Sequence, residues 1–207
     1  MRINTIRLRV MIGWLGILLP WIVALLNLAF PPSVSATYYV ATCIVPFMII
    51  LGSASLLLVS YKGYDKKDDI ILTCSGLAGL CVCLFPCMPD DSLNSILGLM
   101  GGTFGIPANI SNIIHLISAI IFFALLAYNS IFLFTKTHGR ITKKKKIRNI
   151  IYRTCGIGMI ASFLILLLPH FYIQVWLTEA IALFFFGISF LTKAAIYPWL
   201  ACEVKEG

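Results

Sequence analysis

Three ionisable residues lie within otherwise apolar stretches of this sequence: His115, Glu179 and Lys193. Charged side chains are costly inside a membrane, so they usually face a protein interior and mark binding sites, proton relays or ion pathways. Glu179 and Lys193 belong to the same apolar stretch, fourteen residues apart (193 − 179 = 14). On a helix this spacing corresponds to roughly 21 Å along the axis and to nearly the same face. The two residues are therefore too far apart to pair, and each needs a partner from another segment.

The partners expected for these residues divide into two groups. We expect His115 to contact Glu179 near the outer ends of their helices, and Lys193 to approach Asp68 or Asp69 at the inner ends. A polar spine along the last helix would then join an outer cluster to an inner one. The polar pocket predicted from the sequence comprises His115, Glu179, Lys193, Asp68, Asp69, Ser118, His170 and Tyr38.

Each of these residues also has a purely structural interpretation. A lysine near a helix end can extend its ammonium group to the lipid headgroups. Buried polar pairs can fix the packing of membrane helices without any chemistry. The residue types alone leave the functional and the structural interpretations open.

A metal site would need a different arrangement of the same residues. His115, His170 and Glu179 are the weak candidate ligands, since zinc hydrolases use about three protein ligands and one open position for water. The sequence has three histidines and no H-x-x-x-H spacing. We therefore predict no metal or other cofactor, identify no catalytic residues, and lean against an enzyme.

Composition indicates the environment in which these residues lie. The chain has 207 residues, of which 60% are hydrophobic and 12% charged, with a mean hydropathy of +0.96. A soluble domain carries about 25% charged residues, so the outer surface of this chain must face lipid. A membrane-spanning helix needs about 20 apolar residues. The sequence predicts an all-α polytopic bundle of about six transmembrane helices in one domain over residues 1–207, at 10–30, 39–59, 70–88, 113–134, 150–168 and 173–196.

The basic residues predict how the bundle is oriented. In the six-span assignment, nearly all sixteen Lys and Arg fall in loops and tails on one side, and the loops on the other side contain none. Under the positive-inside rule, both termini and the most basic loop are cytoplasmic. Lys143 to Lys146 are expected either to contact anionic headgroups or to act only as a topology signal. The net charge of +8 has this origin, and no nucleic-acid partner is predicted.

Several short motifs add a resemblance to a known family. They include Pro32-Ser33-Val34-Ser35, Tyr61-Lys62-Gly63-Tyr64 and the segment from Phe186 to Lys193. In this order they resemble bacterial six-helix membrane proteins akin to the domain of unknown function 998. The resemblance implies a multi-pass protein of the bacterial inner membrane and supplies no activity. The chain departs from the pattern at Ala36-Thr37, where an acid and an aromatic residue are expected.

Three functions are compatible with these features. The prediction is a membrane protein whose polar site binds a lipid or an apolar small molecule, in a sensor, structural or assembly role. The alternatives are a proton- or ion-coupled transporter or channel, and a zinc-dependent intramembrane lipid hydrolase. A homo-oligomer is compatible with all three.

Overall fold

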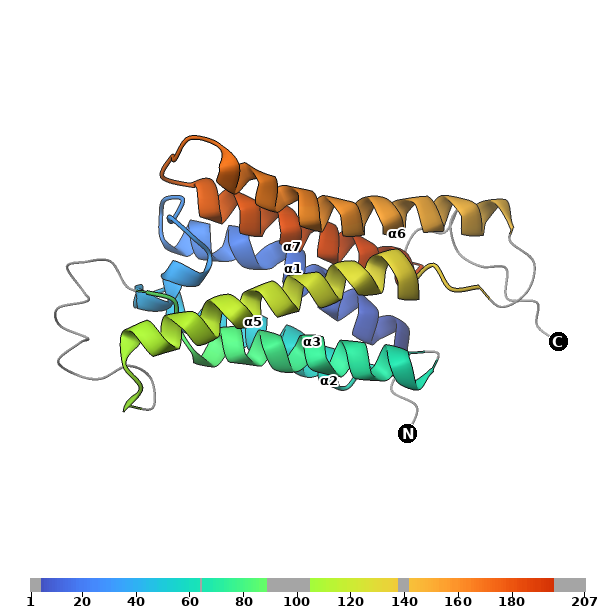
Figure 1. The fold of residues 1–207 in the computed structure, drawn as a ribbon, viewed down its shortest axis with the longest axis horizontal. Coiled ribbons are helices and arrows are strands. Elements are labelled where there is room, and N and C mark those ends of the chain that lie inside the picture. The colour runs from blue at the N-terminus through green and yellow to red at the C-terminus, as the bar shows by residue number, and fades with distance from the viewer. Residues whose placement is uncertain (1–4, 64, 89–104, 138–141, 196–207) are drawn as a thin grey trace.

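The computed structural model describes residues 5–63, 65–88, 105–137 and 142–195, and within these residues it contains helices and no strands. The α-helices lie side by side in one bundle (Figure 1). In the described residues they are α1 (Thr5–Leu26), α2 (Ile44–Val59), α3 (Lys66–Leu84), α5 (Ala108–Tyr128), α6 (Lys143–Ser162) and α7 (Gln174–Lys193). This arrangement confirms the predicted all-α fold.

Four helical segments are long and apolar enough to cross a membrane: α1, α5 with its continuation to Leu133, α6 with its continuation to Leu167, and α7. The α2 helix is apolar but has only 16 residues. The α3 helix begins with four charged residues, Lys66-Lys67-Asp68-Asp69, which lower its mean hydropathy. The structure thus has the helices of a membrane-embedded protein.

At one end of the bundle α1, α3 and α6 begin and α2, α5 and α7 end (Figure 1). The Lys and Arg residues of the described segments gather towards this end. We call this the basic end. The segments of the opposite end that the structure describes (27–43, 85–88, 105–115 and 163–178) contain no Lys or Arg. The charge segregation expected from the sequence is therefore a property of the folded bundle.

The helices start earlier at the basic end than the apolar stretches predict, because polar residues cap them. The side chain of Asp65 accepts a hydrogen bond from the Asp68 amide at 3.0 Å, so α3 begins at Lys66 rather than 70. Thr142 Oγ1 accepts from the Lys145 amide at 3.2 Å, and α6 begins at Lys143 rather than 150. Side-chain acceptors of this kind satisfy amides that lack a partner in the first turn.

At the opposite end the predicted boundaries also shift. The α1 helix ends at Leu26 rather than 30, and α5 begins at Ala108 rather than 113. The predicted helix 39–59 is shorter, because a 3₁₀ turn, η1 (Ser35–Tyr39), precedes α2. Apolar residues here belong to turns that pack on the bundle, so hydropathy alone places the helix ends incorrectly.

Two helices change their winding before they end. After α5 the chain continues as a π-helix, η3 (Asn129–Leu133), in which the Phe134 amide donates to the Asn129 carbonyl at 2.9 Å. After α6 it continues as a 3₁₀ turn, η4 (Phe163–Leu167). A π-segment inside a helix is rare and often lies at a functional site.

Glycine allows α1 and α7 to approach closely. A Cβ atom at Gly187 would lie 2.5 Å from the Gly13 carbonyl oxygen, and one at Gly13 would lie 2.7 Å from Leu191. Small residues at such positions are typical of membrane helix contacts, where close packing replaces the hydrophobic driving force. The close contact holds α7, which carries Glu179 and Lys193, against α1.

The centre of the bundle is filled by a layer of aromatic side chains, which we call the aromatic layer: Phe122, Phe186 and Phe190. All three are buried. The ring centroids of Phe122 and Phe186 are 6.3 Å apart, and those of Phe186 and Phe190 are 5.0 Å apart. Phe186 and Phe190 lie on α7 between Glu179 and Lys193, so the layer separates the two ends of the bundle.

Candidate functional site

Glu179 joins α7 to the connection between α1 and α2. Its carboxylate accepts a hydrogen bond from the Val34 amide at 2.5 Å and another from Ser35 Oγ at 3.0 Å. The Trp176 amide also donates to the Pro32 carbonyl at 3.0 Å, which holds the same connection one turn earlier on α7. The carboxylate is thus fixed in position by groups distant in the sequence.

A small pocket lies beside this carboxylate, and we call it the Glu179 pocket. Ser35 and Glu179 are its polar lining residues. The other lining side chains are apolar and include Leu19 of α1, Leu51 of α2, Val82 of α3, Phe122 of α5 and Leu183 of α7. Its volume is about 30 Å³. The arrangement places a hydrogen-bonding carboxylate at the wall of an apolar cavity between helices.

The structure pairs His115 with the end of α3 rather than with Glu179. His115 is buried, and its Nδ1 lies 2.8 Å from the Phe85 carbonyl oxygen. One turn earlier, Ser111 Oγ donates to the Pro86 carbonyl at 2.9 Å. These contacts tie α5 to the residues that follow α3, as a structural interpretation of His115 would require.

The other residues expected in the outer cluster are dispersed. Ser118 is buried on α5 near His115, and His170 is exposed in the turn before α7. The Tyr38 ring packs edge-on against Tyr39, with centroids 5.4 Å apart. Among the described residues there is no group of three or more His, Cys, Asp or Glu side chains suited to a metal ion. The candidate metal set of His115, His170 and Glu179 is therefore not brought together.

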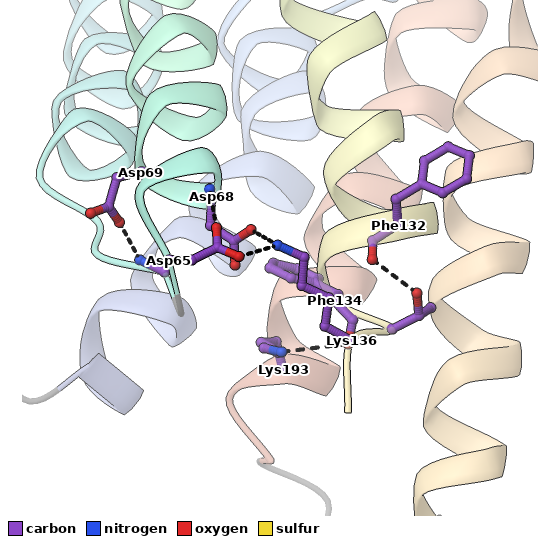
Figure 2. A network of polar contacts seen from close by, with 9 residues as sticks. Asp65, Asp68, Asp69, Phe132, Phe134, Lys136 and Lys193 are labelled. Carbon is purple, nitrogen blue, oxygen red and sulfur yellow. Dashed lines mark hydrogen bonds and ion pairs between the residues drawn. The ribbon is translucent and has the colours of Figure 1, made fainter. Parts of the chain in front are cut away.

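At the basic end, Asp68 and Asp69, the acids expected near Lys193, also bind other groups. Lys136 forms ion pairs with both Asp68 and Asp65, the latter at 2.8 Å (Figure 2). Asp69 accepts a hydrogen bond from the Gly63 amide at 2.7 Å. Lys136 lies just beyond the apolar stretch of α5 and was not among the residues predicted from the sequence.

The ion pair between Lys136 and Asp65 shifts the pKa of each of these two residues. The hydrogen bond from Lys136 is the largest influence on Asp65 and lowers the pKa of its carboxyl group to about 2. The hydrogen bonds to Asp65 and then Asp68 raise the pKa of the Lys136 amine above 10.5. Asp65 and Lys136 therefore both stay ionised over the whole physiological pH range.

Lys193 lies against the segment that follows the π-helix. Its Nζ is 3.5 Å from the Phe134 carbonyl oxygen and 5.0 Å from the centroid of the Phe134 ring (Figure 2). The Lys193 carbonyl accepts a hydrogen bond from Arg9 Nη1 at 3.2 Å, while Arg9 Nε donates to Tyr61 Oη at 2.8 Å. Lys193 and Asp68 do line the same small pocket, so the predicted inner group is partly assembled.

The basic run at the start of α6 divides into two kinds of side chain. Lys145 Nζ donates to the carbonyls of Lys136 and Phe134, at 2.9 and 3.2 Å. Lys143 and Lys146 are exposed. The run thus both fixes the α5–α6 connection and presents positive charge on the surface.

Comparison with protein-family models, curated proteins and solved structures gives no significant match to this chain. The resemblance to the six-helix bacterial family stays a prediction. The geometry of the two ends of the bundle is therefore the basis for a functional proposal.

Proposed function

We propose that the chain is a multi-pass membrane protein that binds a lipid or another apolar molecule through the Glu179 pocket. The observation that carries the proposal is a carboxylate held at the wall of an apolar cavity between α1, α2, α3, α5 and α7. Ligand sites in proteins are typically apolar cavities with a few fixed polar groups. A carboxylate in this position suits a ligand whose polar head donates hydrogen bonds, such as an alcohol or an amine.

The dimensions of the pocket limit how the ligand binds. A volume of about 30 Å³ is room for roughly two water molecules. It therefore accepts the head of a ligand, and the apolar remainder must lie along the lipid-facing surface of the bundle. An ionised carboxylate has about four acceptor positions, and the Val34 amide and Ser35 hydroxyl occupy two of them.

The aromatic layer favours a ligand-binding function for the chain over a function as a transporter or channel. A transporter or channel needs a polar route through the bundle. Along α7, the buried rings of Phe186 and Phe190 lie between Glu179 and Lys193. Phe122 of α5 packs on the same layer. The aromatic layer therefore interrupts the polar spine that the sequence predicts along the last helix. This supports a binding site that is open to one half of the membrane only.

The orientation forms part of the same proposal. The basic end would face the cytoplasm, and the Glu179 pocket would lie in the outer half of the bacterial inner membrane. The absence of Lys and Arg from the described segments of the opposite end supports this orientation. Exposed Lys143 and Lys146 would then lie at the level of anionic headgroups.

Filling the pocket tests the proposal. In Ala119→Leu the larger side chain enters the Glu179 pocket, whereas Ala161→Leu makes the same change on an exposed position of α6. Mass spectrometry of the protein purified in detergent should detect an apolar molecule retained by the wild type and by Ala161→Leu. In Ala119→Leu the retained amount should fall at least about tenfold. Equal retention by both variants would contradict the proposal.

A further inference from the structure

A second pocket lies at the basic end, between α1, α3, the π-helix η3 and α7. Its lining residues include Arg9, Tyr61, Asp68, Asn129 and Lys193, and its volume is about 30 Å³. We call it the Asn129 pocket. It lies on the other side of the aromatic layer from the Glu179 pocket.

Asn129 is the unusual member of this pocket. It is fully buried, and neither Nδ2 nor Oδ1 has a hydrogen-bond partner among the residues that the structure describes. A buried amide without partners is costly, and such groups in native proteins call for a ligand, ion or water that satisfies them. The π-helix begins at Asn129, and its altered winding fixes where this side chain lies.

The charge around the pocket is predominantly positive. Arg9 and Lys193 line it directly. Lys145, Arg9 and Arg148 repel the charge of Lys193, and Asp68 is the acid that opposes them. The carboxylate of Asp68 is already paired with Lys136. An anion entering the pocket would therefore meet an excess of cations and a neutral amide donor.

We propose that the Asn129 pocket binds a phosphate group. Arg9 and Lys193, both half-buried, supply the opposite charge, and Asn129 Nδ2 donates a hydrogen bond to a phosphate oxygen. The small volume admits one or two oxygens of a phosphate presented at the pocket's mouth and no larger molecule. Asn129 Oδ1 then accepts from a protonated phosphate oxygen or from a hydroxyl beside the phosphate. Charge-assisted hydrogen bonds of this kind are the strong ones.

The phosphate could come from a phospholipid headgroup or from free phosphate in solution. To separate these sources, delipidated protein in a neutral detergent is titrated with phosphatidylglycerol and, separately, with inorganic phosphate. The readouts are the thermal unfolding midpoint and the occupancy measured by native mass spectrometry. Arg9→Gln and Lys193→Gln each remove one positive charge from the pocket, and Lys143→Gln removes one from an exposed position at the same end.

We expect Arg9→Gln and Lys193→Gln to weaken phosphate binding about tenfold or more, since one charged hydrogen bond is lost. Lys143→Gln should change it by less than about twofold. Binding of the lipid alone identifies a headgroup site, and binding of inorganic phosphate with the same dependence on the variants identifies a free-phosphate site. Either result supports the inference.

Asn129→Asp adds a further test, because it keeps the shape of the side chain and places a negative charge in the pocket. It should abolish phosphate binding. If this variant does not fold, the two charge variants still decide the question. No binding by the wild type, or equal weakening in Lys143→Gln, would overturn the inference, the latter because it indicates general surface attraction.

Discussion

Glu179 supports the fold as well as the proposed site, because its carboxylate holds the Val34 amide and the Ser35 hydroxyl. Hydrogen bonds to a charged group contribute about 1.5–3 kcal/mol each. We expect Glu179→Leu to lower the free energy of unfolding by about 3 kcal/mol, and Glu179→Gln, whose amide oxygen still accepts, by roughly half as much. Unfolding titrations of the purified variants measure both changes. An unchanged unfolding energy in Glu179→Leu would show that these contacts contribute nothing.

The ion pairs of Lys136 predict a pH dependence at the basic end. The pKa of Asp65 is lowered to about 2 in the folded chain, so its stabilising contribution is complete above its unfolded pKa of about 3.9. The contribution is lost as the pH falls from about 4 towards 2. The pKa of Lys136 is raised, so its contribution is present below about 10.5 and is lost as the pH rises beyond that value.

Thermal unfolding of the wild type and of Lys136→Met measures this effect. The difference between their midpoints should be constant from about pH 5 to 9 and should shrink at both extremes. A difference that persists unchanged to pH 2.5 would contradict the assignment of the ion pair to Asp65.

At the scale of single residues, the sequence predicted which residues are unusual. It predicted less well which residues are in contact. That Glu179 and Lys193 lie on an otherwise apolar helix follows from hydropathy alone. Contacts depend on how each helix is rotated about its axis, so the pairing of His115 with Phe85 was not predictable. Asn129 could have been noticed as a polar residue within an apolar stretch. Its burial without a partner depends on the π-helix, for which the sequence carries no clear signal.

Among the elements, the contact of α1 with α7 leaves no room for added volume at its glycines. Gly187→Ala would place a Cβ atom 2.5 Å from the Gly13 carbonyl oxygen. The same Cβ atom would lie even closer to Ile17 Cγ1. Because a backbone oxygen is in the way as well as a side chain, the helices must separate, at a cost of about 1–3 kcal/mol. The thermal unfolding midpoint of this variant should fall.

Gly52 provides the matched control for this prediction. A Cβ atom there would meet Cys83 Sγ at 3.8 Å, which is an ordinary contact. Gly52→Ala should leave stability unchanged or raise it by up to about 1 kcal/mol, since alanine favours a helix. Equal midpoints for Gly187→Ala and Gly52→Ala would contradict the close packing of α1 and α7.

The number of α-helices in the described part of the chain was predictable, because six apolar stretches are separated by polar or proline-containing turns. The residues at which the helices begin and end were not predictable from the sequence. The physical reason differs between the basic end of the bundle and the opposite end. At the basic end, Asp65 and Thr142 cap helices that extend through charged residues. At the opposite end, apolar residues at 27–30 and 39–43 lie outside the α-helices, in turns.

For the whole molecule, the proposed orientation makes a direct prediction about access from outside the cell. Tyr172 is exposed at the end opposite the basic end, and Lys143 is exposed at the basic end. A membrane-impermeant thiol reagent applied to intact bacteria whose outer membrane has been made permeable should label Tyr172→Cys. It should label Lys143→Cys only after the inner membrane is opened. The unsubstituted chain gives the background from native cysteines, and the reverse pattern would invert the orientation.

The central claim is that an apolar molecule binds with its polar head in the Glu179 pocket. The most direct test uses a long-chain alcohol that carries a photoactivatable diazirine next to its hydroxyl group. After irradiation, peptide mapping should find the label on pocket-lining residues such as Ala119 and Leu183, and an excess of the unmodified alcohol should prevent it. Label confined to the exposed apolar faces of the helices, and insensitive to competition, would contradict the claim.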